Sequence, residues 1–283
     1  EKTNASASEL MTNGRYAIDV LRRDLLHAGY RGVTWATPSD PTTAIGTINN
    51  ECGANFAINL QQAVWGSNDT NPYSANCIPA TNYSLGDVLV VRELATSYTG
   101  IQPVTGTYSG TRGATTIYFR SAYERGEAFL GSTAPTDITT TPYYDFELQA
   151  KAYYVSPFSV SSTESPKVPA LKRVSLGAAG SNAQPGMNDE LVASNVENMQ
   201  VQFGRYTTDG NTQFFNADDI DATTTPSQWN DVISVRIWLL VRASLPEAGY
   251  SNTNTYSLGD KSITVNDAYR REVFSTIVQL RNH

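Results

Sequence analysis

The chain has little charge and no long apolar run. Only 17% of its 283 residues are charged, against about 25% in an average soluble domain, and 20 Lys and Arg face 27 Asp and Glu, for a net charge of −7. An acidic chain without a basic stripe is a poor partner for nucleic acid. Because no run of about 18 apolar residues occurs, the sequence holds no transmembrane span.

Histidine is almost absent, since the chain has only His27 and His283. His27 falls within a predicted helix and His283 is the last residue, so a Ser-His-Asp triad is not expected. No Gly-Lys-Ser/Thr phosphate-binding sequence occurs. Asp218, Asp219 and Asp221 are clustered in a polar loop, which indicates a solvated acidic loop or, as the alternative, a weak calcium site. We therefore expect no enzymatic activity, no cofactor and no other metal.

Cysteine is scarce as well, and the two residues, Cys52 and Cys77, both lie in Asn-, Gly- and Pro-rich sequence. This setting favours one disulfide that closes a surface loop, which would stabilise the fold by roughly 3 kcal/mol. The alternative is two unpaired thiols in a reducing compartment. A metal site is disfavoured because neither cysteine has a Cys-x-x-Cys partner or a nearby histidine.

The first 30 residues predict an amphipathic helix. Its apolar stripe steps by three and four residues, the spacing of one helix face; the stripe consists of Met11, Gly14, Ile18, Leu21, Leu25 and Ala28. A glycine inside a helix costs about 1 kcal/mol relative to Ala, so Gly14 predicts a closely packed neighbour. We expect the C-terminal half of this helix to dock on a domain and its N-terminal half to lead elsewhere.

The rest of the chain predicts strands and loops. Charged residues are few, and the chain is rich instead in Thr, Ser, Asn, Gly and Tyr. This composition is typical of a secreted or surface-displayed β-rich protein. Apolar runs and period-two alternation predict strands near residues 87–92, 115–120, 146–154, 170–176, 198–203, 231–242 and 272–281. No βαβ rhythm occurs, so the sheets should be mostly antiparallel and the class α+β. We expect a single domain over residues 1–283, with the helix in 1–30 and a β-rich head in 33–282.

The sequence between the predicted strands has two further features. Residues 33–82 predict a long irregular excursion that carries both cysteines. The pentapeptide Tyr-Ser-Leu-Gly-Asp occurs at residues 83–87 and again at 256–260. Because the sequence around the two copies differs, we interpret them as two turns that enter strands, not as a structural repeat.

Four segments resemble the PilW family of type IV minor pilins. Residues 14–32, GRYAIDVLRRDLLHAGYRG, resemble the helix of this pilin branch, which ends in D-L-x-x-A-G-aromatic. Residues 191–204, LVASNVENMQVQFG, and the strand in 229–242 resemble a central pair of family strands. Residues 269–282, YRREVFSTIVQLRN, are close to the closing R-R-x-V-F-x-T-x-V-x-L-R-N pattern.

The resemblance implies a pilin-like fold, in which an N-terminal α-helix packs on two mostly antiparallel β-sheets. It implies a minor pilin that primes type IV pilus assembly and joins the pilus-tip complex, with a structural role in adhesion and twitching. The expected partners are other minor pilins, the major pilin and a large tip adhesin.

The family's helix begins with an apolar membrane-spanning half, which is missing before Glu1. The resemblance therefore implies a head that stands in the periplasm of a bacterium, anchored in the inner membrane, and reaches the extracellular pilus after assembly. The stripe residues Met11, Gly14 and Ile18 would lie at the boundary between this domain and the filament.

Three other functions remain open from the sequence. A GspJ-like minor pseudopilin of a type II secretion system would share the fold and the mechanism. A secreted carbohydrate-binding β-sandwich would use exposed Tyr and Trp rings. A secreted hydrolase would have to use His27 or the carboxylates of residues 218–221.

Overall fold

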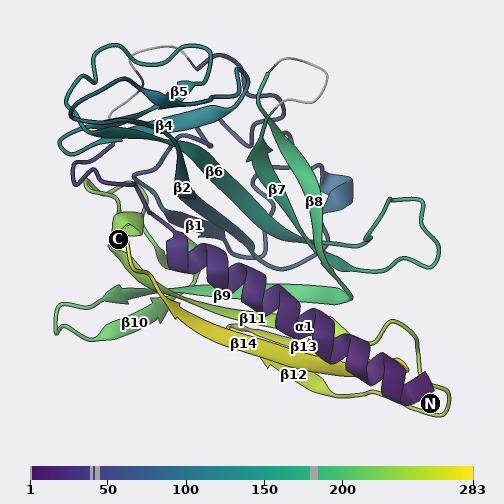
Figure 1. Cartoon of the computed structure of the whole chain (residues 1–283). Helices are drawn as coiled ribbons and strands as arrows, with labels where there is room; N and C mark the ends of the chain where they lie inside the picture. The colour runs from purple at the N-terminus through teal and green to yellow at the C-terminus, as the bar shows by residue number, and fades with distance from the viewer. Residues whose placement is uncertain (1, 39–40, 42–44, 179–183, 283) are drawn as a thin grey trace.

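The computed structural model describes residues 2–38, 41, 45–178 and 184–282. Within them, one α-helix, α1 (Lys2–His27), is followed by strands in three sheets (Figure 1). All paired strands run antiparallel, and one isolated parallel bridge joins Asn49 to Gly186. The expected α+β class, with one N-terminal helix and mostly antiparallel sheets, is confirmed.

The largest sheet has the order β1-β2-β6-β4-β5, with β3 paired to β2 and with β7 between β6 and β8. Its strands are β1 (Val64–Ser67), β2 (Val88–Gln102), β3 (Ser109–Gly110), β4 (Ile117–Ala122), β5 (Gly126–Leu130), β6 (Tyr143–Ser156), β7 (Ala170–Gly177) and β8 (Gly186–Ser194). The long strand β6 holds this sheet together, because it pairs with β2, β4 and β7.

The second sheet has the order β10-β9-β11-β14, and the third is the hairpin β12–β13. Their strands are β9 (Val196–Tyr206), β10 (Thr212–Phe215), β11 (Val232–Arg242), β12 (Thr255–Leu258), β13 (Lys261–Thr264) and β14 (Arg271–Gln279). Short 3₁₀ turns lie at η1 (Ala80–Asn82), η2 (Ala217–Asp219) and η3 (Gln228–Asp231).

Each expected strand overlaps an observed one, but several observed strands were not expected. The missed strands are β1, β3, β5, β8, β10, β12 and β13. Most are short, and β8 carries the polar run Asn188, Asp189 and Glu190, which has no strand periodicity. These segments become strands because a neighbouring strand satisfies their backbone hydrogen bonds, which a local pattern does not reveal.

The strands divide the interior into three apolar clusters. Alternate residues of β2 face opposite sides of the large sheet: Leu89 and Val91 face α1 and the second sheet, whereas Val88 and Val90 face the excursion of residues 45–83. The third cluster lies on the outer face of the second sheet, where the β12–β13 hairpin covers Trp238 and Leu240. Sandwiching the large sheet on both faces explains its continuous apolar runs.

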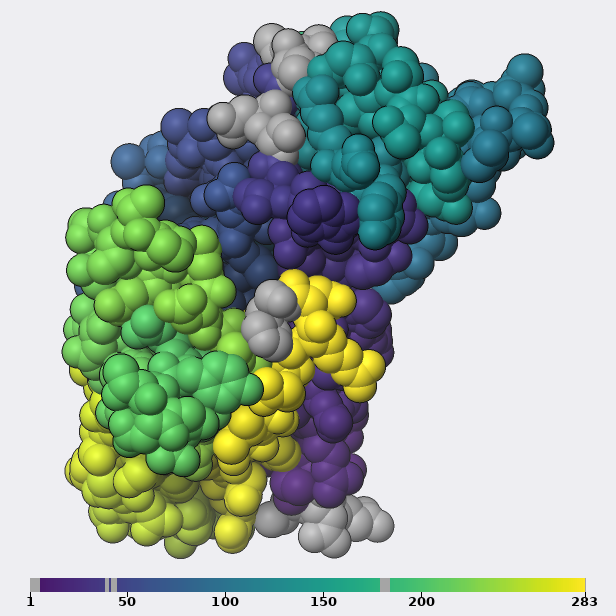
Figure 2. All heavy atoms as spheres, turned by 90° about the vertical axis from the view of Figure 1, so that its left-hand side faces the viewer, coloured from purple at the N-terminus to yellow at the C-terminus, as the bar shows by residue number. Residues whose placement is uncertain are grey.

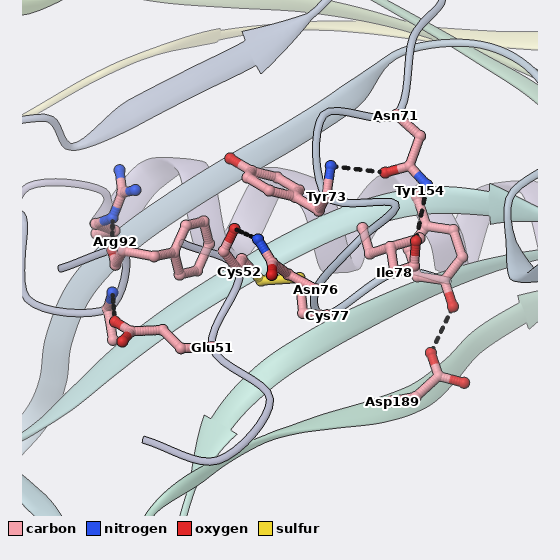
Figure 3. Close-up of a disulfide and its surroundings, with 12 residues drawn as sticks. Glu51, Cys52, Asn71, Tyr73, Asn76, Cys77, Ile78, Arg92, Tyr154 and Asp189 are labelled. Carbon is pink, nitrogen blue, oxygen red and sulfur yellow. Dashed lines mark hydrogen bonds between the residues drawn. A yellow bond between two sulfur atoms is a disulfide. The ribbon is translucent and has the colours of Figure 1, made fainter. Parts of the chain in front are cut away.

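The disulfide between Cys52 and Cys77 is present, as expected, but its setting differs from the prediction. The two residues are 2% and 3% exposed and belong to the cluster between the excursion and the large sheet (Figure 3). Nearby, Arg92 of β2 donates from Nε to the backbone oxygen of Phe56, at 2.6 Å, and from Nη1 to that of Gln62, at 2.9 Å. The excursion is therefore a core layer fastened to the sheet, not a surface loop.

Candidate functional site

The helix docks through a buried face that is wider than the expected stripe. The buried residues include Gly14, Leu21, Leu25 and Ala28 of the stripe, whereas Met11 and Ile18 are only half-buried. Leu10, Ala17 and Val20 are also buried, although the sequence analysis left them out. The helix contacts β14 and β11 on one side and β8 and β2 on the other, so it buries a broad arc. Because Leu10 is buried, docking extends farther toward the N-terminus than expected.

Gly14 lies close against the second sheet. A Cβ at this position would lie 2.2 Å from Cε2 of Phe274 in β14, so only glycine leaves room for the ring. The expectation of a close packing partner at Gly14 is confirmed.

A buried polar network ties the other side of the helix to the large sheet. Asp24 is 7% exposed, and its Oδ2 lies 3.0 Å from Nζ of Lys151 and accepts a hydrogen bond from the hydroxyl of Tyr153. Lys151 also lies 2.8 Å from Oε1 of Glu93, and Nη1 of Arg173 lies 3.8 Å from Asp24. A carboxylate on one face of α1 is thus matched to cations from β6 and β7, which fixes how the helix sits on the sheet.

Burial and neighbouring charges shift the pKa values of two residues in this network, Glu93 and Tyr153. Burial raises the pKa of Glu93, and the ammonium of Lys151 partly opposes this rise. Burial and the neighbouring Asp24 carboxylate raise the pKa of Tyr153, so the phenol remains a hydrogen-bond donor. Removing one partner from such a pair leaves a buried charge without compensation, at a cost of about 3–5 kcal/mol.

The two ends of the chain meet where the helix ends. Gly29, with a φ of +76°, donates its backbone N–H to the oxygen of Arg92 at 2.8 Å. A Cβ on Gly29 would lie 2.6 Å from the backbone oxygen of Asn282. In Figure 1 the C-terminus accordingly lies beside the C-terminal end of α1. This contact joins two of the segments that carry the resemblance to minor pilins.

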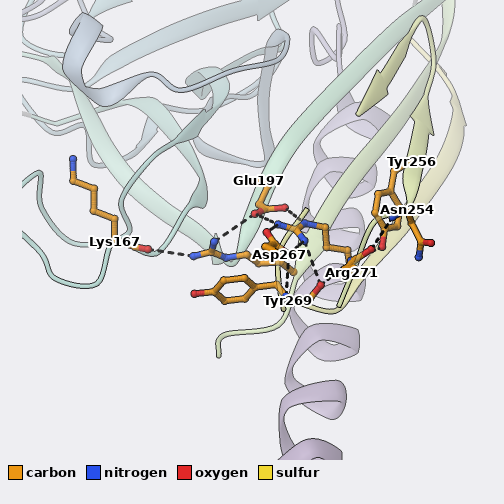
Figure 4. Close-up of polar contacts among 9 residues, drawn as sticks. Lys167, Glu197, Asn254, Tyr256, Asp267, Tyr269 and Arg271 are labelled. Atoms are coloured by element: carbon orange, nitrogen blue, oxygen red, sulfur yellow. Dashed lines mark hydrogen bonds and ion pairs between the residues drawn. The ribbon is translucent and has the colours of Figure 1, made fainter. Parts of the chain in front are cut away.

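A second ionic cluster joins β9 to β14 and to the chain before it (Figure 4). Nη2 of Arg271 lies 3.0 Å from Oε1 of Glu197 and 2.6 Å from Oδ2 of Asp267. The guanidinium of Arg242 stacks over the ring of Tyr269, at 4.3 Å from its centroid. In the closing segment, Arg271 thus ties β14 to β9 through Glu197 and to the preceding chain through Asp267.

The outer face of α1 is left open to other molecules. Its exposed residues include Arg15, Tyr16, Asp19, Arg22 and Arg23, and Tyr16 is 55% exposed. Figure 2 shows the purple helix at the molecular surface beside the yellow C-terminal strand. Among the helices that the structure describes, none is long and apolar enough to cross a membrane.

Two exposed aromatic residues that the sequence pattern does not single out lie in contact. Trp35 and Tyr123 are 68% and 65% exposed, and their ring centroids lie 6.4 Å apart at an interplanar angle of 60°. The two residues are far apart in the sequence, so no local pattern signals their contact. The inclined rings do not share a plane, unlike a flat stacking platform for sugars.

The loop carboxylates singled out from the sequence do not converge on one another. Asp218 accepts a hydrogen bond from Nδ2 of Asn68, whereas Asp221 accepts from the backbone and hydroxyl of Thr223 at 2.7 and 2.6 Å. The adjacent Asp219 lies in the short turn η2. In the described ranges, no three or more His, Cys, Asp or Glu side chains form a group that could hold a metal ion. The described contacts give no support to the alternative of a calcium site made of residues 218, 219 and 221, which stays a prediction.

No described hydrogen bond joins His27 to these carboxylates. Nδ1 of His27 lies 2.9 Å from the backbone oxygen of Arg23, one turn back in the same helix. His283 lies outside the described residues.

Comparison with known protein families finds one match. The family described as PilW, Type IV Pilus-assembly protein W, matches residues 152–282. This match confirms the resemblance to PilW-family minor pilins over the C-terminal part of the chain. The helix of residues 14–32 lies outside the matched range.

One solved structure and the curated proteins complete the comparison. The chain is similar to a type IV-like pilin from Thermus thermophilus, with 16% sequence identity, a TM-score of 0.40, and coverage of 98% of this chain and 96% of that one. No curated protein sequence matches this chain.

Proposed function

We propose that this chain is a minor pilin that helps to prime type IV pilus assembly and forms part of the pilus-tip complex. Its role in adhesion and twitching would be structural, and it would catalyse no reaction. The observation that carries the proposal is the PilW match over residues 152–282. The docking of α1 between two sheets supports it, because a rigidly held helix can transmit the position of the head to a filament.

The protein would assemble with other pilins through two surfaces, the outer face of α1 and the loops of the head. The outer face of α1, with Tyr16 at its centre, would meet the helices of neighbouring subunits, while the head would keep its own core intact. Residues 205–228 and the outward side of the layer formed by residues 45–82 would offer surface to other minor pilins, the major pilin and a large tip adhesin. Such contacts are heterologous and do not close on themselves, which suits a growing filament.

The proposed location is the inner membrane with the head in the periplasm, followed by the extracellular pilus. An apolar segment preceding the described helix would provide the anchor. The Cys52–Cys77 disulfide supports an oxidising compartment, where such bonds form and persist.

The test is capture of partners by a photo-crosslinking amino acid placed at Tyr16. Co-expression with candidate minor pilins should yield crosslinks to one of them. The matched control places the same group at Tyr98 of β2, which is 50% exposed but lies outside the helix, and should yield fewer. Crosslinks to secretion pseudopilins would instead favour a GspJ-like role, and the absence of any pilin or pseudopilin partner would refute the proposal.

A further inference from the structure

Strand β14 forms one edge of the second sheet. In the order β10-β9-β11-β14 it pairs with β11 along nine residues, without a shift of register. Its other side pairs with no strand that the structure describes. Figure 2 shows this yellow part of the chain at the molecular surface, beside the purple helix. The backbone of β14 therefore has one side available to another molecule.

The hydrogen bonds at the two ends of β14 show which of its backbone groups point away from the sheet. Leu280 donates its N–H to the oxygen of Ile233 at 2.8 Å. At the other end, Ala243 donates to the oxygen of Arg270, also at 2.8 Å. Bonded and non-bonded pairs alternate in an antiparallel ladder, so the even-numbered residues of β14 bond to β11. The outward N–H and C=O groups, which contact no described hydrogen-bond partner, belong to Arg271, Val273, Ser275, Ile277 and Gln279.

Among the described strands, the other sheet edges are short or charged. β3 has two residues, β1, β10, β12 and β13 have four each, and β5 has five. The long edge strand β8 has nine residues but carries Asp189 and Glu190 in its middle. Residues 273–278 of β14, in contrast, contain no charged residue and no proline. Because proteins generally protect long edges by such devices, this unprotected edge indicates pairing with another chain.

Helix α1 borders this edge with a strip of half-buried apolar side chains. Phe274 of β14 packs against Gly14 of the helix. Met11 and Ile18 lie about one turn to either side of Gly14, and both are only partly buried, as Phe274 is. Met11 lines a hollow together with Arg271, at the start of β14. The strip therefore runs beside the strand, where an added strand would cover it.

Two basic side chains continue the same flank of the helix. Counting about 100° per residue around the helix, Arg15 and Arg22 lie on the same flank as Ile18. Asp24, which contacts the large sheet, lies on the opposite flank. Both arginines are exposed, and neither forms an ion pair with a described residue. A carboxylate on an incoming segment would therefore meet a complementary charge.

We propose that the free edge of β14 binds an extended segment of a neighbouring pilus subunit as an added β-strand. The choice of partner rests on the proposed function. The outward backbone groups of β14 supply the hydrogen bonds, and pockets for alternate side chains supply the specificity. The segment carries apolar residues on the side that faces the helix and a carboxylate that meets Arg15 or Arg22. A second copy of this chain is not the expected occupant, because it would bring the same two arginines against the first pair.

The experiment is amide hydrogen exchange, followed residue by residue by NMR, in the chain alone and in its mixtures with candidate minor pilins. In the chain alone, the amide of Thr276 should be protected by β11, whereas those of Ser275 and Ile277 should exchange freely. Binding of a pilin should slow exchange at Ser275 and Ile277 by at least about tenfold. This alternating pattern reports backbone pairing, which contact through side chains alone would not produce.

Matched variants at residue 275 test the backbone directly. Ser275→Pro removes an outward N–H but leaves the bonds to β11 intact, since proline is tolerated on the solvent side of an edge strand. It should weaken pilin binding at least about tenfold. The control, Ser275→Ala, keeps the N–H and should bind as the wild type does. Arg22→Glu should weaken binding several-fold, and its effect should shrink as salt concentration rises.

The outcomes separate this inference from the proposed function. A pilin that binds but leaves exchange at Ser275 and Ile277 unchanged would overturn the inference, while the proposed function stands. Equal binding by folded Ser275→Pro and Ser275→Ala would do the same. If no candidate minor pilin binds or crosslinks at Tyr16, both the proposed function and the inference fail.

Two further controls complete the test. Protection that rises with the concentration of the chain alone would show that a second copy occupies the edge, which contradicts the proposal. Circular dichroism checks the folding of each variant. If Ser275→Pro does not fold, the exchange measurement on the wild type still decides the question.

Discussion

Gly14 of α1 lies directly against the ring of Phe274 in β14, close enough that a Cβ on the glycine would be 2.2 Å from Cε2. The contact joins the first element of the chain to the last strand. A glycine in mid-helix is less stable than alanine by about 1 kcal/mol. Here the missing side chain lets the helix dock closely on the second sheet.

Gly14→Ala should therefore destabilise the fold although alanine is the better helix former. Overpacking in a core costs about 1–3 kcal/mol, which should exceed the propensity gain of about 1 kcal/mol. Urea denaturation followed by circular dichroism measures the difference. Ser8→Ala, on the exposed face of the same helix, should be nearly neutral. An alanine variant at residue 14 that is more stable than the wild type would contradict the packing argument.

Helix periodicity predicted the element but placed its buried face imperfectly. Leu10 and Ala17 are buried, yet the strict stripe favoured Met11 and Ile18, which are half-buried. A helix that lies between two sheets buries a wider arc than one stripe, and periodicity alone does not reveal how many surfaces a helix contacts.

Long-range relationships explain the other differences. The cysteine pairing followed from the sequence, but the depth of Cys52 did not, because its apolar neighbours, such as Ile45 and Ile78, are scattered along the excursion. The buried network around Asp24 was missed for the same reason, because Lys151 and Glu93 come from strands far from the helix in the sequence.

Asp24→Ala should be strongly destabilising, because it leaves the ammonium of Lys151 buried with only Glu93 as its partner. The expected loss is about 3–5 kcal/mol in the free energy of unfolding. A double-mutant cycle with Lys151→Met tests the cause, since the combined variant should lose less than the sum of the single losses. Additive losses would show that the two side chains act independently.

Glu93 should make stability depend on pH in a direction opposite to that of an ordinary ion-paired carboxylate. Burial raises its pKa in the folded state above the ordinary value of 4.5. The folded state then holds this proton more tightly than the unfolded state, so the contribution of Glu93 is full below pH 4.5 and falls as pH rises through the folded pKa.

Denaturation of the wild type and of Glu93→Gln between about pH 4 and pH 8 measures this effect. The stability of the wild type relative to the variant should decrease as pH rises. A relative stability that increases over this interval would show that Lys151 outweighs burial at Glu93.

The disulfide should contribute to stability as a fastener of the layer over the large sheet. Cys52 and Cys77 are 25 positions apart, and closing such a loop stabilises the fold by about 3 kcal/mol. Reductant should therefore lower the Tm of the wild type by roughly 6–12 °C, measured by differential scanning fluorimetry. The double variant Cys52→Ser/Cys77→Ser should melt lower from the outset and show no response to reductant. An unchanged melt with two titratable thiols would mean that close packing around residues 52 and 77 holds the excursion in place without the covalent bond.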